Sequence, residues 1–381
     1  MSRPILKTKL CDMLGIEYPI MLAAMAPNMS DPPLVAAVSE AGGIGVLACT
    51  DKTPDEIHDM AAETRKLTDK PFGMDVGIPS RVETLSFNFK EAVAMAALPE
   101  EYVKLRDEFL ADHGIPYADD VSKKTPGMGA TGAFMVGYEL GKAQVAAILD
   151  VAPALFVSAL GDPSFMVEEA HRRGVKVMGQ VGRTRDALRV KGVDAMICTG
   201  TGAGGHSGAV DGMALIPRIV RLLSPATPVI AGGCIVDGRG LAGALALGAI
   251  GVWVGTRFIA SKECNARPWY KQAIVDADDM STVRTNWYTG KPTRHIQSEW
   301  DATCDQSGLP NLGMPRQAVL AAPMVLGAVE AGHYRESGIM CGQGSVGIES
   351  VLPVREIIDN MVEEAREILA NELPTKVSLA D

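Results

Sequence analysis

The fold of this chain is constrained most by a regular alternation between short apolar runs and stretches that begin like helices. A run such as "GIGVLAC" (43–49) is apolar almost throughout, which predicts a strand buried on both faces, as in a parallel sheet. Between the runs, Asp31 before two prolines and Thr53 before "PDE" are typical helix starts. Eight apolar runs follow the pattern, at residues 19–24, 43–49, 71–79, 154–160, 175–181, 195–199, 228–233 and 251–258.

Eight strand–helix units within about 260 residues predict an α/β fold, a (β/α)8 TIM barrel. An open, doubly wound parallel sheet is the alternative, because it is built from the same units. We assign residues 1–81 and 135–276 to the barrel.

Two segments do not fit the repeat. Residues 82–134 form an insert after the third strand, with a charged, helix-rich part at 98–116 and a connector at 122–134. Because the C-terminal ends of barrel strands carry the active site, this insert is a candidate lid. Residues 277–381 form a C-terminal helical extension, expected to pack on the barrel, that ends in a strongly amphipathic helix. Simple padding of the barrel rim is the alternative for both segments.

Composition excludes several classes of partner. The 381 residues include 36 basic and 46 acidic ones, and a net charge of −10 disfavours nucleic acid. Seven scattered cysteines without a C-x-x-C pair argue against a disulfide framework and a structural zinc site. We find no signal peptide and no apolar run of the ~18 residues that a membrane span needs. We therefore expect a cytoplasmic monomer or homodimer that acts on a small molecule, without a membrane partner.

The stretch "CTGTGAGGHSG" (198–208) contains Gly200, Gly202 and Gly205 at the G-x-G-x-x-G spacing of dinucleotide-binding loops. That interpretation needs a helix starting inside the glycines and an acid about 20 residues later. Here the chain continues "HSGAVDGMALIP", and beyond Asp211 the next acid is Asp237. The stretch is therefore not interpreted as a nicotinamide-binding turn.

The position of this loop favours a catalytic histidine instead. The loop follows the sixth predicted strand, so it lies at the C-terminal rim of the barrel. His206 is the histidine that is embedded in glycines, and an imidazole there is suited to proton transfer near neutral pH. A histidine that only satisfies a hydrogen bond of the loop is the alternative.

A second pair of glycine turns predicts a phosphate site. The seventh strand ends in Gly232 and Gly233, and the eighth ends in Gly255 and Thr256. In barrels the loops after these two strands commonly hold a phosphate with backbone N–H groups. Ordinary glycine turns are the alternative.

Together these residues resemble the nitronate monooxygenase family, formerly called 2-nitropropane dioxygenases. It is a family of FMN-dependent TIM-barrel flavoproteins that includes flavin-dependent enoyl reductases. The resemblance rests on the segments "PIMLAAMA", "AGGIGVLA", "PFGMDVGIP", "AGGHSG", "AGGCIVDGRGLAGALALGAIGVWVGTRF", "TGKPTR", "GMPRQAVL" and "CGQGSVGI".

The resemblance implies a role for each matching residue. His206 matches the catalytic histidine, and no metal is implied. The residues expected to contact FMN are Ala23, Ala24 and Met25 at the ring, Asp75, Gln180 and Thr199 at strand ends, Gly204 and Gly205 under the flavin, and Gly232, Gly233, Gly255 and Thr256 at the phosphate.

Two positions depart from the family pattern. The family often has Glu where Gly202 stands, and Asn where Asp75 ends the third strand. A carboxylate beside the flavin would disfavour an anionic reduced ring and lower its potential.

The resemblance implies an FMN-dependent oxidoreductase, a nitronate monooxygenase that oxidises alkyl nitronates or nitroalkanes with O2 to a carbonyl compound and nitrite. The alternative within the family is an NAD(P)H-dependent reductase, acting on an enoyl thioester (enoyl-CoA or acyl carrier protein) or a quinone. A more remote alternative is a flavin- or phosphate-binding module without catalysis.

Overall fold

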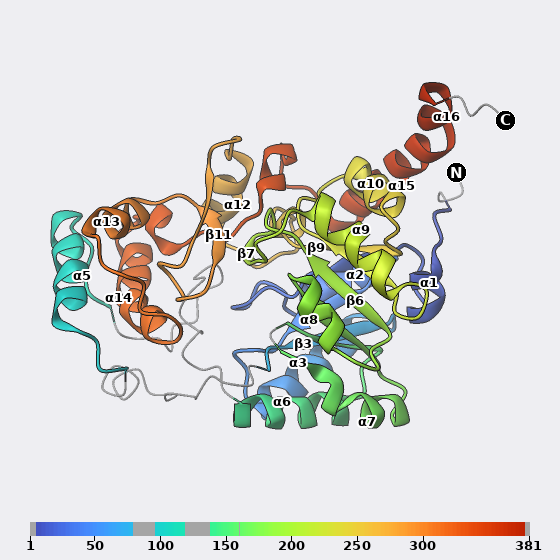
Figure 1. The fold of residues 1–381 in the computed structure, drawn as a ribbon, viewed down its shortest axis with the longest axis horizontal. Coiled ribbons are helices and arrows are strands. Elements are labelled where there is room, and N and C mark those ends of the chain that lie inside the picture. Colours follow the sequence, from blue (N-terminus) through green and yellow to red (C-terminus); the bar gives the residue numbers. More distant parts are fainter. Residues whose placement is uncertain (1–4, 79–95, 119–137, 160, 378–381) are drawn as a thin grey trace.

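The structure is a computed structural model that describes residues 5–78, 96–118, 138–159 and 161–377. Its central sheet runs in the order β1-β9-β8-β6-β5-β4-β3-β2, and a parallel bridge between Met21 and Ile44 brings β1 back beside β2. The sheet thus closes almost completely into the predicted (β/α)8 barrel, and the open-sheet alternative is wrong (Figure 1). The eight strands, all parallel, are β1 (Ile20–Leu22), β2 (Gly45–Ala48), β3 (Phe72–Val76), β4 (Leu155–Ser158), β5 (Lys176–Val181), β6 (Ala195–Thr199), β8 (Val229–Gly232) and β9 (Gly251–Val254).

Alternate residues of the barrel strands belong to two different cores. Leu155 and Val157 of β4 belong to a core shared with most other strands, whereas Phe156 packs with residues of the helices. Since strand side chains alternate between two faces, the shared core is the barrel interior. Helix α1 (Lys9–Leu14) adds Leu10 to this interior and closes the N-terminal end of the barrel. The opposite, C-terminal end is therefore the one left for a cavity.

An outer layer of helices covers the sheet, as Figure 1 shows. Their N-termini bear out the predicted caps, because Asp31 accepts a hydrogen bond from the Leu34 N–H and Thr53 forms a capping box with Glu56. The helices of this layer are α2 (Pro32–Glu40), α3 (Pro54–Leu67), α6 (Tyr138–Val151), α7 (Val167–Arg172), α8 (Thr184–Arg189), α9 (Gly212–Leu223) and α10 (Gly238–Ala246).

A second, smaller core lies beside the barrel. It joins α5 (Glu100–Asp112) to α13 (Glu299–Ser307) and α14 (Arg316–Ala331) through buried residues that include Phe109 and Trp300. In Figure 1 the cyan helix α5 lies against the orange helices α13 and α14, although almost 200 residues separate them in the chain. The described part of the predicted insert thus packs with the C-terminal extension.

The remainder of the extension returns to the barrel. Helix α15 (Val354–Glu367) packs against α10 and α2, and it continues into a π-helical turn (Ile368–Glu372) and α16 (Leu373–Lys376). The connector predicted at 122–134 lies outside the described residues. The lid and the division of the chain into domains stay predictions.

A three-stranded sheet links the barrel to the extension. Its strands are β7 (Gly205–His206), β10 (Thr282–Thr285) and β11 (Thr293–Ile296), with β11 in the centre and both pairings antiparallel. The smaller elements are α11 (Thr256–Ile259), α12 (Pro268–Val275) and the 3-10 turns at 163–165, 334–337 and 343–347. Within the described residues, no helix is both long and apolar enough to cross a membrane.

The docking of α14 against the α5 segment can be tested at one glycine. A Cβ added to Gly327 would lie 1.8 Å from the carbonyl oxygen of Pro116, so we expect Gly327→Ala to destabilise the protein by about 1–3 kcal/mol. Gly243→Ala in α10 is the matched control: its Cβ would meet nothing within 4 Å, and we expect a gain of roughly 0.4–1 kcal/mol. Denaturant unfolding measures both variants, and wild-type stability of Gly327→Ala would contradict this packing.

Candidate active site

A cavity of about 300 Å³ lies at the C-terminal ends of the barrel strands. It brings together residues from β2, β3, β5, β6 and β9, from the loops after β1, β6, β8 and β9, and from the extension. Gly232 alone among the predicted site residues does not border it; it ends β8 and accepts a hydrogen bond from the Gly200 N–H. The predicted residues that line the cavity are Ala23, Ala24, Met25, Asp75, Gln180, Thr199, Gly204, Gly205, His206, Gly233, Gly255 and Thr256.

The segment after β1 is held in place by one buried hydroxyl. Ser30 donates a hydrogen bond to the carbonyl of Ala23 at 2.9 Å and accepts one from the N–H of Met25 at 3.0 Å. Ser30 is 1% exposed, so these bonds are shielded from water. The segment can thus present a fixed, apolar wall to a ligand.

The two predicted phosphate turns have a backbone geometry that would let a ligand approach the main chain closely. Gly233 has φ +97°, a conformation that favours glycine, and a Cβ there would lie 3.1 Å from the Cβ of Ala203. A Cβ on Gly255 would lie 3.3 Å from the Sδ of Met25. Side chains at either position would therefore crowd the cavity wall.

The hydroxyl of Thr256 connects these turns to the extension. It accepts a hydrogen bond of 3.0 Å from the N–H of Gly342, in the segment "CGQGSVGI". Because the hydroxyl accepts here, its own proton stays available for a ligand. The nearby backbone contact from the Gln343 N–H to the Gly202 carbonyl, 2.9 Å long, ties the same segment to the loop after β6.

The departure at Gly202 has a steric explanation. A Cβ at this position would lie 2.2 Å from the Sγ of Cys234 and 3.0 Å from the Oε1 of Gln343. The thiol and the amide thus occupy the space that a glutamate side chain would need. Cys234 itself has φ +58° and borders the cavity.

Two polar side chains at neighbouring strand ends are paired with each other. The Gln180 amide at the end of β5 donates a hydrogen bond of 3.0 Å to the Thr199 hydroxyl at the end of β6. This bond fixes the amide oxygen of Gln180 and leaves it free to accept from a ligand.

Asp75 is buried at the cavity without a partner for its outer oxygen. The residue is 3% exposed, and its Oδ2 has no hydrogen-bond partner within the described part of the chain. Burial raises the pKa of this carboxyl well above its usual value, which favours the protonated, neutral form. In that form the carboxyl can donate a hydrogen bond to a ligand.

The backbone of His206 is fixed by strand pairing. In the register of β7 with β11, His206 lies opposite Thr293 and Gly205 lies opposite Arg294. Arg284 adds two hydrogen bonds to Ser207, one from Nε to the hydroxyl (3.1 Å) and one from Nη2 to the carbonyl (3.0 Å). The extension thus holds both ends of the histidine segment.

The ring of His206 contacts Thr289, in the turn between β10 and β11. Its Nε2 lies 3.1 Å from the Thr289 hydroxyl, which in turn donates to the carbonyl of Lys291 at 3.1 Å. Since that hydroxyl has only one proton, the contact assigns the proton of the ring to Nε2. Nδ1 then keeps the lone pair that a base needs.

The ring is uncharged at neutral pH. The residue keeps an exposed surface toward the cavity, but the surrounding protein withdraws it from bulk water. This desolvation, together with the positive charge of Lys291, lowers the pKa of His206 to about 4. A neutral imidazole at the cavity wall can accept a proton or a hydrogen bond from a ligand.

Sequence reasoning assigned no role to several of these groups. Thr289 and Lys291 belong to "TGKPTR", and Gly342 belongs to "CGQGSVGI". Both segments contributed to the family resemblance, but no function was assigned to their residues. Cys234 stands beside a predicted phosphate glycine and could have been found by its position. Thr289 gave no signal of its own, because its contact with His206 spans 83 residues.

Comparison with known proteins identifies the family of this chain. The sequence model of the family described as nitronate monooxygenase matches residues 7–364. A Mycobacterium tuberculosis protein named as a monooxygenase is 33% identical over 375 residues, covering 94% of this chain and 96% of its own. A Bacillus subtilis protein named as a nitronate monooxygenase is 30% identical over 365 residues, covering 92% of this chain and 96% of its own.

Solved structures show the same architecture. The nitroalkane oxidase of Streptomyces ansochromogenes superposes with a TM-score of 0.76 at 25% identity, covering 94% of this chain and 98% of that structure. FabK from Thermotoga maritima superposes with a TM-score of 0.69 at 28% identity, covering 98% of this chain and 100% of that structure. The match of the family model over the barrel, the His206 loop and the extension confirms the predicted resemblance: this chain belongs to the nitronate monooxygenase family and is an oxidoreductase.

Proposed function

We propose that this protein is an FMN-dependent oxidase of alkyl nitronates and nitroalkanes, which uses O2 and releases a carbonyl compound and nitrite. The observation that carries the proposal is a neutral histidine, His206, held at the wall of a cavity that the two glycine turns also line. The structure of the Streptomyces nitroalkane oxidase supports the substrate class by similarity.

The residues of the cavity fit FMN. The glycine turns at Gly233 and Gly255 leave room where a Cβ would crowd the wall, as a phosphate cradle requires. The unpartnered Oδ2 of Asp75 and the amide of Gln180 are polar groups suited to the edge of a flavin ring. Ala23, Ala24 and Met25 offer the apolar surface on which a ring packs.

When bound, FMN supplies the electron acceptor that takes a pair of electrons from the substrate and passes them to oxygen. His206 acts on the substrate proton. With a neutral nitroalkane, Nδ1 of His206 accepts the proton from the carbon that bears the nitro group. Thr289 keeps the ring oriented through Nε2 during this transfer. With a preformed nitronate the proton is already gone, and His206 only contacts the bound anion.

The alternative activity is reduction of an enoyl thioester or a quinone with NAD(P)H as reductant, which the superposition on FabK favours. In that reaction His206 would donate a proton to the carbon next to the carbonyl. Anaerobic mixing with NAD(P)H separates the two, because rapid bleaching of the flavin absorbance is expected only of the reductase.

The phosphate cradle can be tested with two variants of equal shape. We expect the cofactor released from the wild-type protein to be identified as FMN by its mass. We expect Gly233→Asp to bind FMN about a thousandfold more weakly than Gly233→Asn. Both variants carry the backbone strain of φ +97°, so their difference isolates the charge. Two unit charges about 4 Å apart repel by roughly 4 kcal/mol at an effective dielectric near 20. Equal FMN affinity of the two variants would place the phosphate elsewhere.

The role of His206 is tested with His206→Asn. We expect a loss of ~10²–10⁴-fold in kcat/KM for a neutral nitroalkane, the usual contribution of a positioned base, and a far smaller loss for the preformed nitronate. Because the pKa of His206 is lowered to about 4, the wild-type rate with nitroalkane should hold from neutral pH down to about 5 and fall as the pH passes through about 4. Equal losses on both substrates would contradict proton transfer.

The protonation of Asp75 is tested with Asp75→Asn. Burial raises the pKa of Asp75 well above its usual value, which favours the uncharged form of the wild-type group. We therefore expect the reduction potential of bound FMN at pH 7 to change little on this substitution. A clear rise of the potential would instead reveal a carboxylate in the wild type, because removing a negative charge favours the reduced ring.

A further inference from the structure

Lys291 lies in the rigid turn that also carries the partner of His206. The Thr289 hydroxyl donates to the Lys291 carbonyl at 3.1 Å and accepts from the Lys291 N–H at 3.2 Å. Gly290, with φ +82°, packs so tightly that a Cβ would lie 2.2 Å from the carbonyl carbon of Gly313. The hydroxyl of Tyr288, a fully buried residue, lies 2.8 Å from the Ser298 hydroxyl and 3.2 Å from the carbonyl oxygen of Glu336. Lys291 is thus presented from a turn that cannot readily move.

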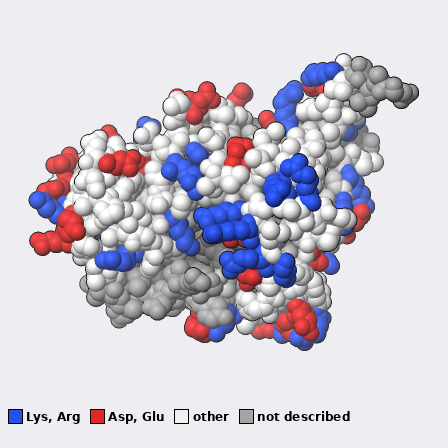
Figure 2. All heavy atoms as spheres, viewed as in Figure 1, with Lys and Arg blue, Asp and Glu red and all other residues white. Residues whose placement is uncertain are grey.

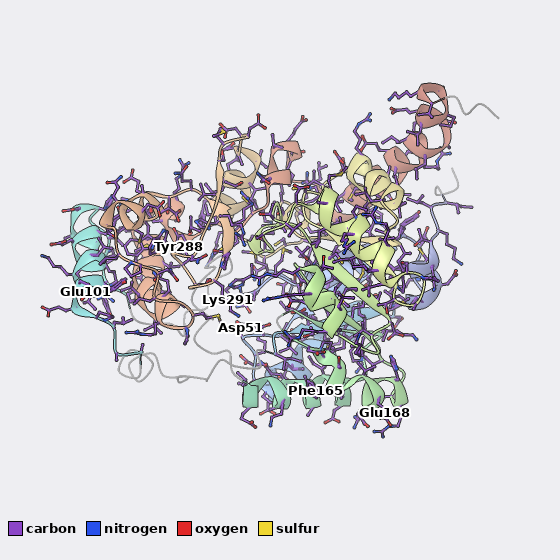
Figure 3. All side chains as sticks on the ribbon, viewed as in Figure 1. Asp51, Glu101, Phe165, Glu168, Tyr288 and Lys291 are labelled. Atoms are coloured by element: carbon purple, nitrogen blue, oxygen red, sulfur yellow. The ribbon has the colours of Figure 1, made fainter. Side chains whose placement is uncertain are left out.

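The ammonium group of Lys291 is a cation without an acidic partner among the described residues. The Lys291 side chain is partly buried. Burial lowers the pKa of Lys291, as expected when a charge is withdrawn from water without compensation. Its charge is close enough to His206 to lower the pKa of that ring as well. Figure 3 shows Lys291 between the barrel and the helices α13 and α14.

Other cations surround the same loop but are already engaged or open to water. Arg284 is bound to Ser207, and Arg294 donates from Nε to the carbonyl of Thr201 at 3.0 Å. Arg183 is exposed to water. Burial lowers the pKa of Arg284, and the nearby charge of Arg183 lowers it further. Figure 2 shows Lys and Arg side chains gathered in the middle of this face, although the whole chain carries a charge of −10. Arg284 and Arg294 therefore bring positive charge close to the segment that carries His206.

We propose that Lys291 is a specificity-determining residue that binds the negatively charged group of the substrate beside His206. The inference rests on the proposed function for the identity of that group, the nitronate oxygens. The chemistry it needs is more general, namely binding of a small anion beside His206. For a neutral nitroalkane, the same ammonium group stabilises the negative charge that develops as His206 takes the proton.

Several titratable and charged groups near His206 could affect its pKa and therefore the pH dependence of the reaction. Asp51, Asp75, Cys234 and Tyr270 line the same cavity, and the arginines of β10 and β11 contact the loop from the extension. Among all these, Lys291 is the charge that acts on the pKa of His206. Removing it should shift the pKa of His206 upward, toward its ordinary value.

The experiment compares Lys291→Met with Lys66→Met in the FMN-bound enzyme. Methionine keeps the length of the side chain without the charge, and Lys66 is an exposed lysine in the last turn of α3, at the opposite end of the barrel. We expect Lys291→Met to raise the KM for a primary nitronate about ten- to hundredfold, a loss between those of exposed and buried ion pairs. For neutral nitroethane at pH 8 we expect little change in KM but a lower kcat, because the charge that develops during proton transfer is no longer stabilised. With nitroethane, the acid limb of the pH profile should move to higher pH. Lys66→Met should match the wild type.

A binding measurement makes the test independent of turnover. Nitrate is a planar anion similar to a nitronate, and its binding is followed by the change in flavin absorbance. We expect the Kd of nitrate to rise about tenfold or more in Lys291→Met and to stay unchanged in Lys66→Met. If the wild type does not oxidise nitronates yet shows this Lys291-dependent binding, the proposed function fails and the anion site stands. Equal nitrate affinity in wild type and Lys291→Met, or no nitrate binding at all, would overturn the inference.

Discussion

The geometry of the site depends on a very short piece of antiparallel pairing, the two residues of β7 against β11. A loop as rich in glycine as 200–208 has no means of its own to hold one histidine in one place, since Gly205 itself has φ +66° and open space around its Cα. The pairing opposite Thr293 and Arg294 supplies what the loop lacks. It sets the direction in which His206 projects and so brings the ring to Thr289.

The pairing can hold β7 in place only if β11 is itself fixed, and β11 is fixed by contacts with the second core. Its His295 is fully buried and contacts the carboxylate of Asp301 at 2.9 Å, and Asp301 also accepts hydrogen bonds from Thr285 and Ser298. Burial by itself would raise the pKa of Asp301, but these hydrogen bonds and the contact with His295 together outweigh it and lower the pKa. A charged, fully bonded carboxylate therefore ties the strand to α13. The histidine of the barrel is thus positioned from outside the barrel.

This dependence explains what sequence reasoning could and could not reach. The barrel was predictable because each strand is a local apolar run; the run at 195–199 coincides with β6. The glycine turns were predictable because the fold fixes their place at the ends of β8 and β9. The contact of His206 with Thr289 was not, since β7 has only two residues and no strand pattern, and its partner comes 83 residues later. Likewise, the thiol of Cys234 fills the space beside Gly202. This steric contact between two loops could not be predicted from a local sequence pattern.

One physical cause gives the cavity its chemical character. Withdrawal from water disfavours the charged form of any group, so it acts in opposite directions on acids and bases. It lowers the pKa of His206 to about 4 and raises that of Asp75 well above its usual value, so it favours the neutral form of both groups. In these forms the site offers a base with a free lone pair and an acid with a proton to donate. Among the described residues the charge of Lys291 has no counterion, and an anionic substrate is the partner that would compensate it.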